Sequence, residues 1–165
     1  MSQSLTHKPT GIPLDRQSLL TLAKFLLLVM GGGFLIGLTF TPGEWYAGLN
    51  KPPFNPPSWV FGPVWTVIYL FIAIVGWRIH QRGDLRPLRG LWWTQLALNF
   101  LWTPAFFYLN MPWLAFAVIA PLLVSIVALL VRLAPTDRLS AALFVPYAGW
   151  VGYASVLNLS IAILN

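Results

Sequence analysis

The segment WYAGLNKPPFNPPSWVFGPVWT, residues 45–66, constrains the fold more than any other part of the chain. It interleaves proline with tryptophan, tyrosine and phenylalanine, carries a single lysine and directly precedes a long apolar run. Each proline removes a backbone donor and clashes with the preceding helical turn, so this segment cannot be an interior helix. We expect a rigid aromatic loop that enters a hydrophobic helix at about Trp59. Its rings form either an anchor at headgroup depth or a lid over a cavity for a flat apolar ligand.

The composition places the chain in a membrane. Of its 165 residues, 58% are hydrophobic and 8% are charged, and the mean hydropathy is +0.72, whereas about a quarter of a soluble domain is charged. Cysteine is absent, which excludes disulfides, thiolate metal sites and a thiol nucleophile. The residues before Leu19 lack the short apolar region and cleavage site of a signal peptide, so we expect the first hydrophobic helix to direct targeting.

Five apolar runs approach the roughly 20 residues that a helix needs to cross a bilayer. In hydrocarbon, such runs satisfy their backbone hydrogen bonds as helices. The predicted fold is therefore an all-α membrane protein, a bundle of five transmembrane helices with the Pro/Trp-rich loop between helices 1 and 2. A polar N-terminal tail, residues 1–18, would precede a single domain, residues 19–165. The predicted spans are residues 19–40, 59–79, 91–108, 113–131 and 143–164.

The basic residues predict the orientation of the bundle. With five crossings, one basic residue, Lys51, falls on the side of the aromatic loop, and all the others fall on the side of the N-terminus. By the positive-inside rule the N-terminus is cytoplasmic and the aromatic loop faces away from the cytoplasm. Topology and anionic lipid explain the net charge of +6, so we expect the lipid bilayer, and no nucleic acid, as a partner.

Ionisable groups are scarce within the predicted spans, which disfavours a pump or transporter with a buried relay. His80 lies at a helix end beside Arg78 and Arg82. We expect it to be solvated, with axial haem ligation as the alternative, and His7 in the tail is a weaker candidate. The sequence shows no hydrolytic triad, metal cluster or phosphate-binding loop. We therefore predict no metal site and no obligatory cofactor.

Two predicted helices carry uncharged polar groups and aromatic rings on one face. On the third helix these are Gln95, Asn99, Trp102 and Phe106, and on the fifth they are Tyr147, Trp150, Val151, Ala154 and Asn158. The amides either join helices or contact a ligand, whereas the rings of Trp102 and Trp150 suit the walls of a ligand site. In the first helix, Gly33 and Gly37 form a GxxxG pair that allows close approach within the bundle or to a second protomer.

Three stretches carry a family resemblance: residues 45–66, the LNFLW run around Asn99 and Trp102, and the PYAGWVGYASVLN run at residues 146–158. Together they resemble the translocator protein family, also called tryptophan-rich sensory proteins or peripheral-type benzodiazepine receptors. The resemblance covers nearly all of the chain after Gly31. The pattern WY…L.KP.F.PP.WVF.PVWT is too long and too particular to arise by chance.

The resemblance implies a membrane receptor or sensor-like protein that regulates tetrapyrrole metabolism or a stress response. Its ligands would be porphyrins, such as protoporphyrin IX and haem-related tetrapyrroles, and isoquinoline carboxamide-type molecules, held in a cavity within the bundle. Protoporphyrin IX or haem would be a ligand and not a cofactor. The pocket residues that the resemblance implies are Tyr46, Trp65, Tyr69, Asn99, Thr103, Phe106, Trp150 and Ala154. Trp102 is added to them because it shares the face of Asn99 and Phe106 on the third helix. Thr103 stands where some bacterial members have an amide.

The resemblance also implies a homodimer. Animal members carry a proposed cholesterol motif near the end of the fifth helix, but here Leu159 and Ile163 occupy those positions, so cholesterol binding is not expected. This difference indicates a bacterial member in the cell membrane. Two alternative functions stay open: an enzyme that promotes light- and oxygen-dependent porphyrin degradation through Trp65 and Trp150, and a transporter of tetrapyrroles or other small apolar molecules.

Overall fold

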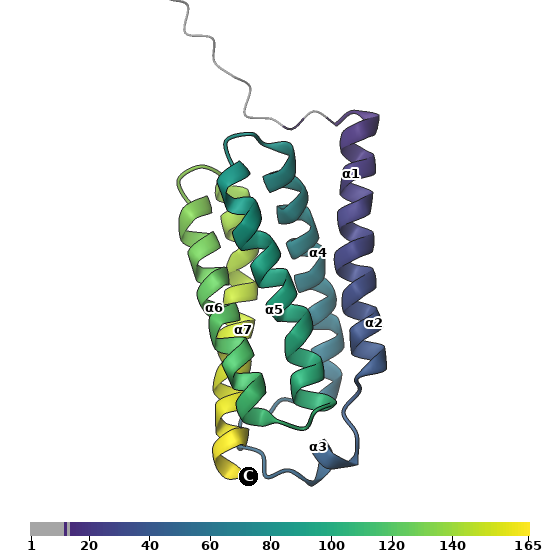
Figure 1. Ribbon diagram of the computed structural model, residues 1–165, viewed down its shortest axis with the longest axis vertical. Coiled ribbons are helices and arrows are strands. Elements are labelled where there is room, and N and C mark those ends of the chain that lie inside the picture. The colour runs from purple at the N-terminus through teal and green to yellow at the C-terminus, as the bar shows by residue number, and fades with distance from the viewer. Residues whose placement is uncertain (1–11, 13) are drawn as a thin grey trace, which may run out of the picture.

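The computed structural model describes residue 12 and residues 14–165, and these form helices and connecting segments without a strand. The long helices stand side by side, each antiparallel to the next along the chain (Figure 1). The connection before α4, the turn between α5 and α6 and the end of α7 gather at one end of the bundle, which we call the loop end. Much of the predicted polar tail, including His7 and Lys8, lies outside the described residues.

The first rod is continuous and contains three helical segments: the α-helix α1 (Arg16–Leu26), a π-helical segment (Leu27–Gly31) and the α-helix α2 (Gly32–Thr39). It begins at Arg16 because Asp15 is its N-cap and accepts a hydrogen bond from the Ser18 N–H at 2.7 Å. The connection that follows contains the short helix α3 (Glu44–Gly48) and a 3₁₀ turn (Ser58–Val60). The helical turn of α3 ends before Pro52, as the loss of backbone donors at proline requires.

Four longer helices complete the bundle. They are α4 (Phe61–Gln81), α5 (Arg89–Phe107), which follows a 3₁₀ turn (Arg86–Leu88), α6 (Pro112–Leu133) and α7 (Arg138–Leu164). Segments Arg16–Thr39, Ser58–Gln81, Pro112–Leu133 and Arg138–Leu164 are long and apolar enough to cross a membrane. The structure thus supports four of the predicted spans, while a crossing by α5, which carries Gln95 and Asn99, stays a prediction.

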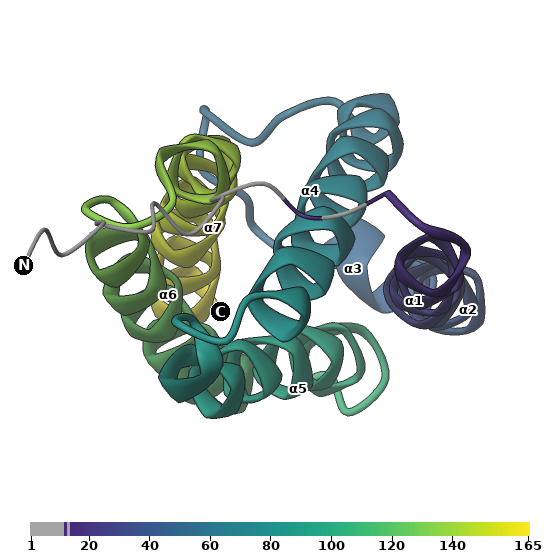
Figure 2. The same cartoon turned by 90° about the horizontal axis from the view of Figure 1, so that it is seen from above.

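The core lies between α4, α5, α6 and α7. There α6 packs along both α5 and α7, whereas the first rod lies outside, with α1 on α4 and α2 on α5 (Figure 2). Trp92 and Phe144 are completely buried in this core. The outward side chains are apolar too, including Leu27, Leu38 and Val124. Apolar groups both inside and outside a helical bundle are expected when its solvent is lipid.

An ion-pair cluster ties α4 to α7 at the end opposite the loop end. The Arg78 guanidinium donates to both carboxylate oxygens of Asp137, at 3.0 and 2.9 Å, and Ser140 Oγ donates to the same carboxylate at 2.7 Å. Burial raises the pKa of Asp137, but the hydrogen bonds from Arg78 and Ser140 outweigh burial and hold its pKa below the usual value. Asp137 also caps α7 by accepting from the Ser140 N–H.

Candidate functional site: an aromatic chamber and an outer cleft

Five aromatic rings from three elements follow one another through the loop half of the bundle. We call them the aromatic column: Tyr69, Trp65, Trp102, Phe106 and Tyr46. Trp65 stacks on Tyr69 of α4 with centroids 5.3 Å apart, and it faces Trp102 of α5 at 6.4 Å with the rings 31° from parallel. The ring of Tyr46 meets Phe106 edge to face at 6.1 Å. The i, i+4 spacing on α4 and α5 places the four helical rings on facing sides.

The column borders a small inner chamber beneath α3. Its volume is about 20 Å³, which is room for a single water molecule. The lining residues are Tyr46, Phe61, Trp102, Phe106, Phe107, Ala154, Leu157, Asn158 and Ile161. Trp45 and Tyr46 of α3 both pack against Phe106. The chamber is therefore closed by the protein's own aromatic rings.

The amides beside the column join helices. Trp102 Nε1 donates to Asn158 Oδ1 at 3.0 Å, and Asn158 Nδ2 donates to the carbonyl of Pro112 at 2.8 Å. Asn99 Nδ2 donates to the Tyr147 hydroxyl at 2.8 Å. That hydroxyl donates in turn to Gln95 Oε1 at 2.9 Å. The helix-joining role expected as one alternative is thus observed, although Asn99 Oδ1 and Gln95 Nε2 are buried without a partner among the described residues.

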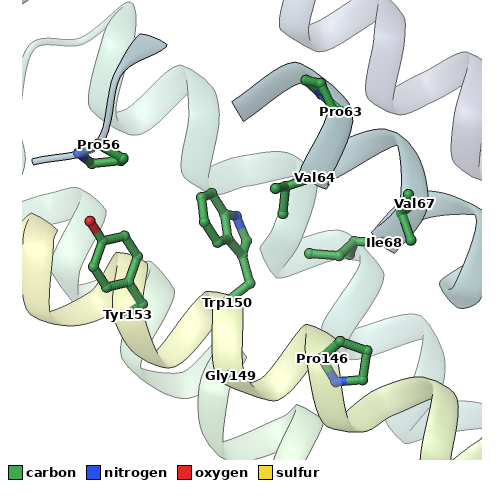
Figure 3. Close-up of a pocket in the computed structure, with 9 residues that line it drawn as sticks. All are labelled: Pro56, Pro63, Val64, Val67, Ile68, Pro146, Gly149, Trp150 and Tyr153. Atoms are coloured by element: carbon green, nitrogen blue, oxygen red, sulfur yellow. The ribbon is translucent and has the colours of Figure 1, made fainter. Parts of the chain in front are cut away.

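A larger outer cleft opens between α4 and α7. Its volume is about 670 Å³, within the range of ligand pockets. It is lined by Pro56, Pro63, Val64, Val67, Ile68, Pro146, Gly149, Trp150 and Tyr153, and the Trp150 indole projects between the two helices (Figure 3). Trp150 meets Phe61 edge to face with centroids 5.6 Å apart. Its Nε1 is buried and has no hydrogen-bond partner among the described residues.

The connection between α2 and α4 is fastened over the loop end. Asn165 at the end of α7 bonds both backbone groups of Asn50, accepting from N–H at 2.9 Å and donating to C=O at 3.0 Å. The Tyr153 hydroxyl donates to the carbonyl of Phe54 at 2.6 Å. The Tyr46 hydroxyl donates to Asn55 Oδ1 at 3.1 Å. These bonds hold α3, and with it Tyr46, against the chamber.

The structure places eight of the nine residues expected to contact a ligand in four different surroundings. Tyr46, Trp102, Phe106 and Ala154 line the chamber, and Trp65 and Tyr69 extend the column. Trp150 lines the outer cleft, and Asn99 lies in the amide network. Thr103 is half-buried and lines neither cavity.

Sequence reasoning missed several lining residues. Phe61 lies within the aromatic segment at residues 45–66, and Phe107 adjoins Phe106, so the aromatic pattern contained a signal for both. Leu157 and Ile161 had no distinguishing signal, because their types are ordinary in a transmembrane helix. Asn165 was missed because its partner Asn50 is remote in sequence.

His80 and Gly33 have close neighbours in the bundle, and His80 is only half-buried. His80 sits among Phe25, Trp92 and Trp93, and its Nδ1 lies 2.8 Å from the carbonyl of Gly76. Within the described residues no group of three or more His, Cys, Asp or Glu side chains could hold a metal ion. A Cβ on Gly33 would collide with the Tyr69 ring, so this glycine serves packing within the bundle.

These features define an α-helical membrane protein with an aromatic chamber inside its bundle. Residues 25–164 match the TspO/MBR family. A tryptophan-rich protein TspO of Archaeoglobus fulgidus is 38% identical over 90% of this chain and 99% of its own length. The chain belongs to the TspO/MBR family, which confirms the resemblance seen in the sequence motifs.

Relatives from distant organisms are similar to most of the chain. Protein CrtK of Rhodobacter capsulatus is 38% identical over 78% of this chain and 83% of its own length. The human translocator protein is 36% identical, with 76% of this chain and 79% of that protein covered. The family match at residues 25–164 includes the connection that carries α3.

Proposed function

We propose that this protein is a receptor or sensor-like membrane protein that binds porphyrins and isoquinoline carboxamide-type ligands in the aromatic chamber. The observation that carries the proposal is the facing pair of Trp65 and Trp102, 6.4 Å apart and 31° from parallel. A flat ring held between two others needs about 7 Å, because each van der Waals contact takes about 3.5 Å. The pair would therefore have to separate beyond its present centroid distance of 6.4 Å to admit a planar macrocycle.

Ligand binding requires the chamber to open. A volume of about 20 Å³ holds no porphyrin, since sites for drug-sized ligands are some hundreds of Å³. The rings that fill the space belong partly to α3, a five-residue helix within a proline-rich connection. Withdrawal of Trp45 and Tyr46 would expose Phe106 and leave the α5 and α7 walls in place. The proposal thus assigns to this connection the role of a lid.

Uncharged polar groups would orient the ligand. Asn99 Oδ1 and Trp150 Nε1 are a buried acceptor and a buried donor without partners among the described residues. A buried polar atom without a partner costs free energy that a suitable ligand group recovers. The Tyr46 hydroxyl, now bonded to Asn55, becomes available to a propionate when the lid moves.

The remaining parts of the proposal come from the sequence. The protein would regulate tetrapyrrole metabolism or a stress response from a bacterial cell membrane, where it would form a homodimer. The N-terminus of each protomer would be cytoplasmic, and α5, the third long helix along the chain, would also cross the membrane and bring the number of crossings to five. Porphyrin degradation and transport are the rival functions. Trp65 adjoins the chamber through its contact with Trp102, and Trp150 adjoins it through its contact with Phe61, so an indole-dependent photoreaction is testable with the same protein.

Titration with protoporphyrin IX in lipid nanodiscs tests the proposal. Trp65→Leu removes one ring of the facing pair and should weaken binding roughly tenfold, because stacking is lost along with buried area. Trp59→Leu is the matched control, since Trp59 lies in the same segment and is 75% exposed. Equal affinity in the wild type and both variants would place the ligand elsewhere and overturn the proposal.

A further inference from the structure

We propose that the outer cleft between α4 and α7 is the entrance through which a planar apolar ligand reaches the chamber from the bilayer, with Phe61 and Trp150 as its gate. This inference rests on the proposed function. It adds a route and two gating residues to the chamber described above. The occupant of the cleft is the ligand in transit, a flat apolar molecule that carries a hydrogen-bond acceptor.

The position of the cleft makes lipid its surroundings. Apart from Pro56, its lining residues belong to segments Ser58–Gln81 and Arg138–Leu164, both of which can cross a membrane. The lining is almost wholly apolar, and Val67 on its rim is 48% exposed. Because Tyr153 at one end also bonds the connection at Phe54, the cleft lies near the loop end of the spans. Amphipathic aromatic molecules collect at that depth of a bilayer.

A single aromatic contact links the cleft to the chamber. Phe61 lines the chamber, Trp150 lines the cleft, and their rings touch edge to face. Ala154, one turn beyond Trp150 on α7, lines the chamber with Phe61. Rotation of the Trp150 ring away from Phe61 would therefore join the two spaces on the side of the small Ala154.

The Trp150 indole also supplies a polar cue for the ligand. Its Nε1–H is buried without an acceptor among the described residues, beside a cleft with almost no polar lining. A buried donor of this kind ordinarily has a partner. A carboxylate or carbonyl on the incoming ligand can accept this hydrogen bond while its rings lie against Val64 and Ile68. The gate would thus favour planar acids and amides over plain hydrocarbon chains.

The alternative route, past the lid, must break more bonds. Moving the connection from the loop end separates Asn50 from Asn165 and Phe54 from Tyr153, with the loss of three hydrogen bonds. The Trp150 ring has none to lose among the described residues. Opening toward the bilayer therefore breaks fewer hydrogen bonds, and the lid then adjusts around a ligand that is already inside.

Gly149 is a position at which a larger side chain can block the cleft without disturbing the core. No atom lies within 4 Å of a Cβ built on Gly149, which lines the cleft. Gly149→Leu should fill the entrance without crowding the bundle, and leucine favours helix over glycine. Gly152→Leu is the matched control, because Gly152 has equally open surroundings on the same helix but lies outside the cleft lining. Val67→Phe narrows the cleft from α4 and serves as a second, independent variant.

The test measures association and dissociation rates by stopped-flow tryptophan quenching, with protoporphyrin IX already dissolved in the nanodisc lipid. The entrance predicts that both rates fall at least tenfold in Gly149→Leu and Val67→Phe. The equilibrium Kd should stay within about twofold, and Gly152→Leu should match the wild type. Wild-type rates in both cleft variants would mean that the cleft holds only lipid chains. A weakened affinity with an unchanged association rate would mean that the ligand binds in the cleft itself. Either result overturns the proposal that the cleft is an entrance. Absence of binding to the wild type would instead overturn the proposed function and the entrance with it.

Discussion

The ring of Tyr69 occupies the space that a side chain on Gly33 would need. A Cβ built on Gly33 would lie closer to this ring than real Cβ atoms ever come, whereas a Cβ on Gly37 meets no atom within 4 Å. The two glycines of the GxxxG pair therefore have different roles. Gly33 allows the Tyr69 ring to pack against the first rod, whereas Gly37 has open surroundings. Because Tyr69 stacks on Trp65, this contact also positions one end of the aromatic column.

Because Gly33 is crowded and Gly37 is not, we expect alanine substitutions at the two positions to differ in their effect on stability. Gly33→Ala should lower the free energy of unfolding by about 1–3 kcal/mol, since the added methyl forces the buried Tyr69 ring to move. Gly37→Ala should be neutral or slightly stabilising, because alanine favours helix and the site is open. Reversible unfolding in mixed detergent measures both variants. Equal stability of the two would show that Gly33 and Tyr69 are not in the contact described.

Asp137 predicts an acid-dependent loss of stability. Its folded pKa is lowered, because hydrogen bonds from Arg78 and Ser140 outweigh burial. Its contribution is therefore fully present above the unfolded pKa of about 4 and is lost as pH falls through the folded pKa. Asp137→Asn keeps an N-cap side chain for α7 but breaks the ion pair, and should cost about 2–3 kcal/mol at neutral pH, at or below the usual loss for a buried pair.

Unfolding measured from pH 7 to pH 2 checks this prediction. The difference between wild type and Asp137→Asn should be constant above about pH 5 and shrink below about pH 4. Asp84→Asn is the control, because Asp84 pairs with Arg82 but its side chain is 55% exposed. It should cost less than about 1 kcal/mol. A pH-independent difference for Asp137→Asn would contradict the assigned role of the charge.

Asn165 predicts how firmly the lid is held. Asn165→Ala removes both hydrogen bonds to the backbone of Asn50, so amides of residues 46–55 should exchange at least several-fold faster with solvent deuterium, with little change in global unfolding. Asn165→Asp keeps the acceptor and loses the donor, and should give an intermediate rate. Unchanged exchange in Asn165→Ala would show that other contacts hold the connection.

The extent to which the sequence predicted the fold differs from one helix to the next. Hydrophobic run length located the four segments that can cross a membrane, since lipid demands about the same helix length in any sequence. The run gave no sign that helix would continue back to Arg16, because that start depends on the cap formed by Asp15. Run length also did not predict that α5 would fall outside the group of helices apolar enough to cross a membrane. Gln95 and Asn99 of α5 were noted for other reasons.

The sequence predicted which residue types form the site, but it did not predict that the chamber would be closed. Helical spacing placed Trp102 and Phe106 on one face and Tyr147, Ala154 and Asn158 on another, and these faces do meet. Closure of the chamber depends on how α3 seats Trp45 and Tyr46, which no periodicity encodes. The outer cleft exists partly because Gly149 has no side chain. The sequence does not show that α4 lies opposite this glycine, so the cleft could not be predicted from it.

Catalysis and binding predict different results from tryptophan replacement. If Trp65 and Trp150 mediate a photoreaction, Trp65→Phe and Trp150→Phe should keep much of their porphyrin affinity and lose the distinctive product, because phenylalanine retains the ring but lacks the indole N–H. A binding protein predicts that product merely follows occupancy. Illumination at matched saturation, with and without oxygen, distinguishes them. Equal product per bound ligand in the wild type, both variants and an unrelated porphyrin-binding protein would leave binding alone.

The most direct measurement is the affinity of Ala154→Thr for protoporphyrin IX. Ala154 is 4% exposed and lines the chamber beside Phe106, so a larger β-branched side chain should crowd the ligand by about 1–3 kcal/mol, roughly a 5- to 150-fold loss of affinity. Ala142→Thr, at an exposed position on the same helix, should bind as the wild type does. If Ala154→Thr binds both protoporphyrin IX and an isoquinoline carboxamide with wild-type affinity, the ligand does not occupy the aromatic chamber.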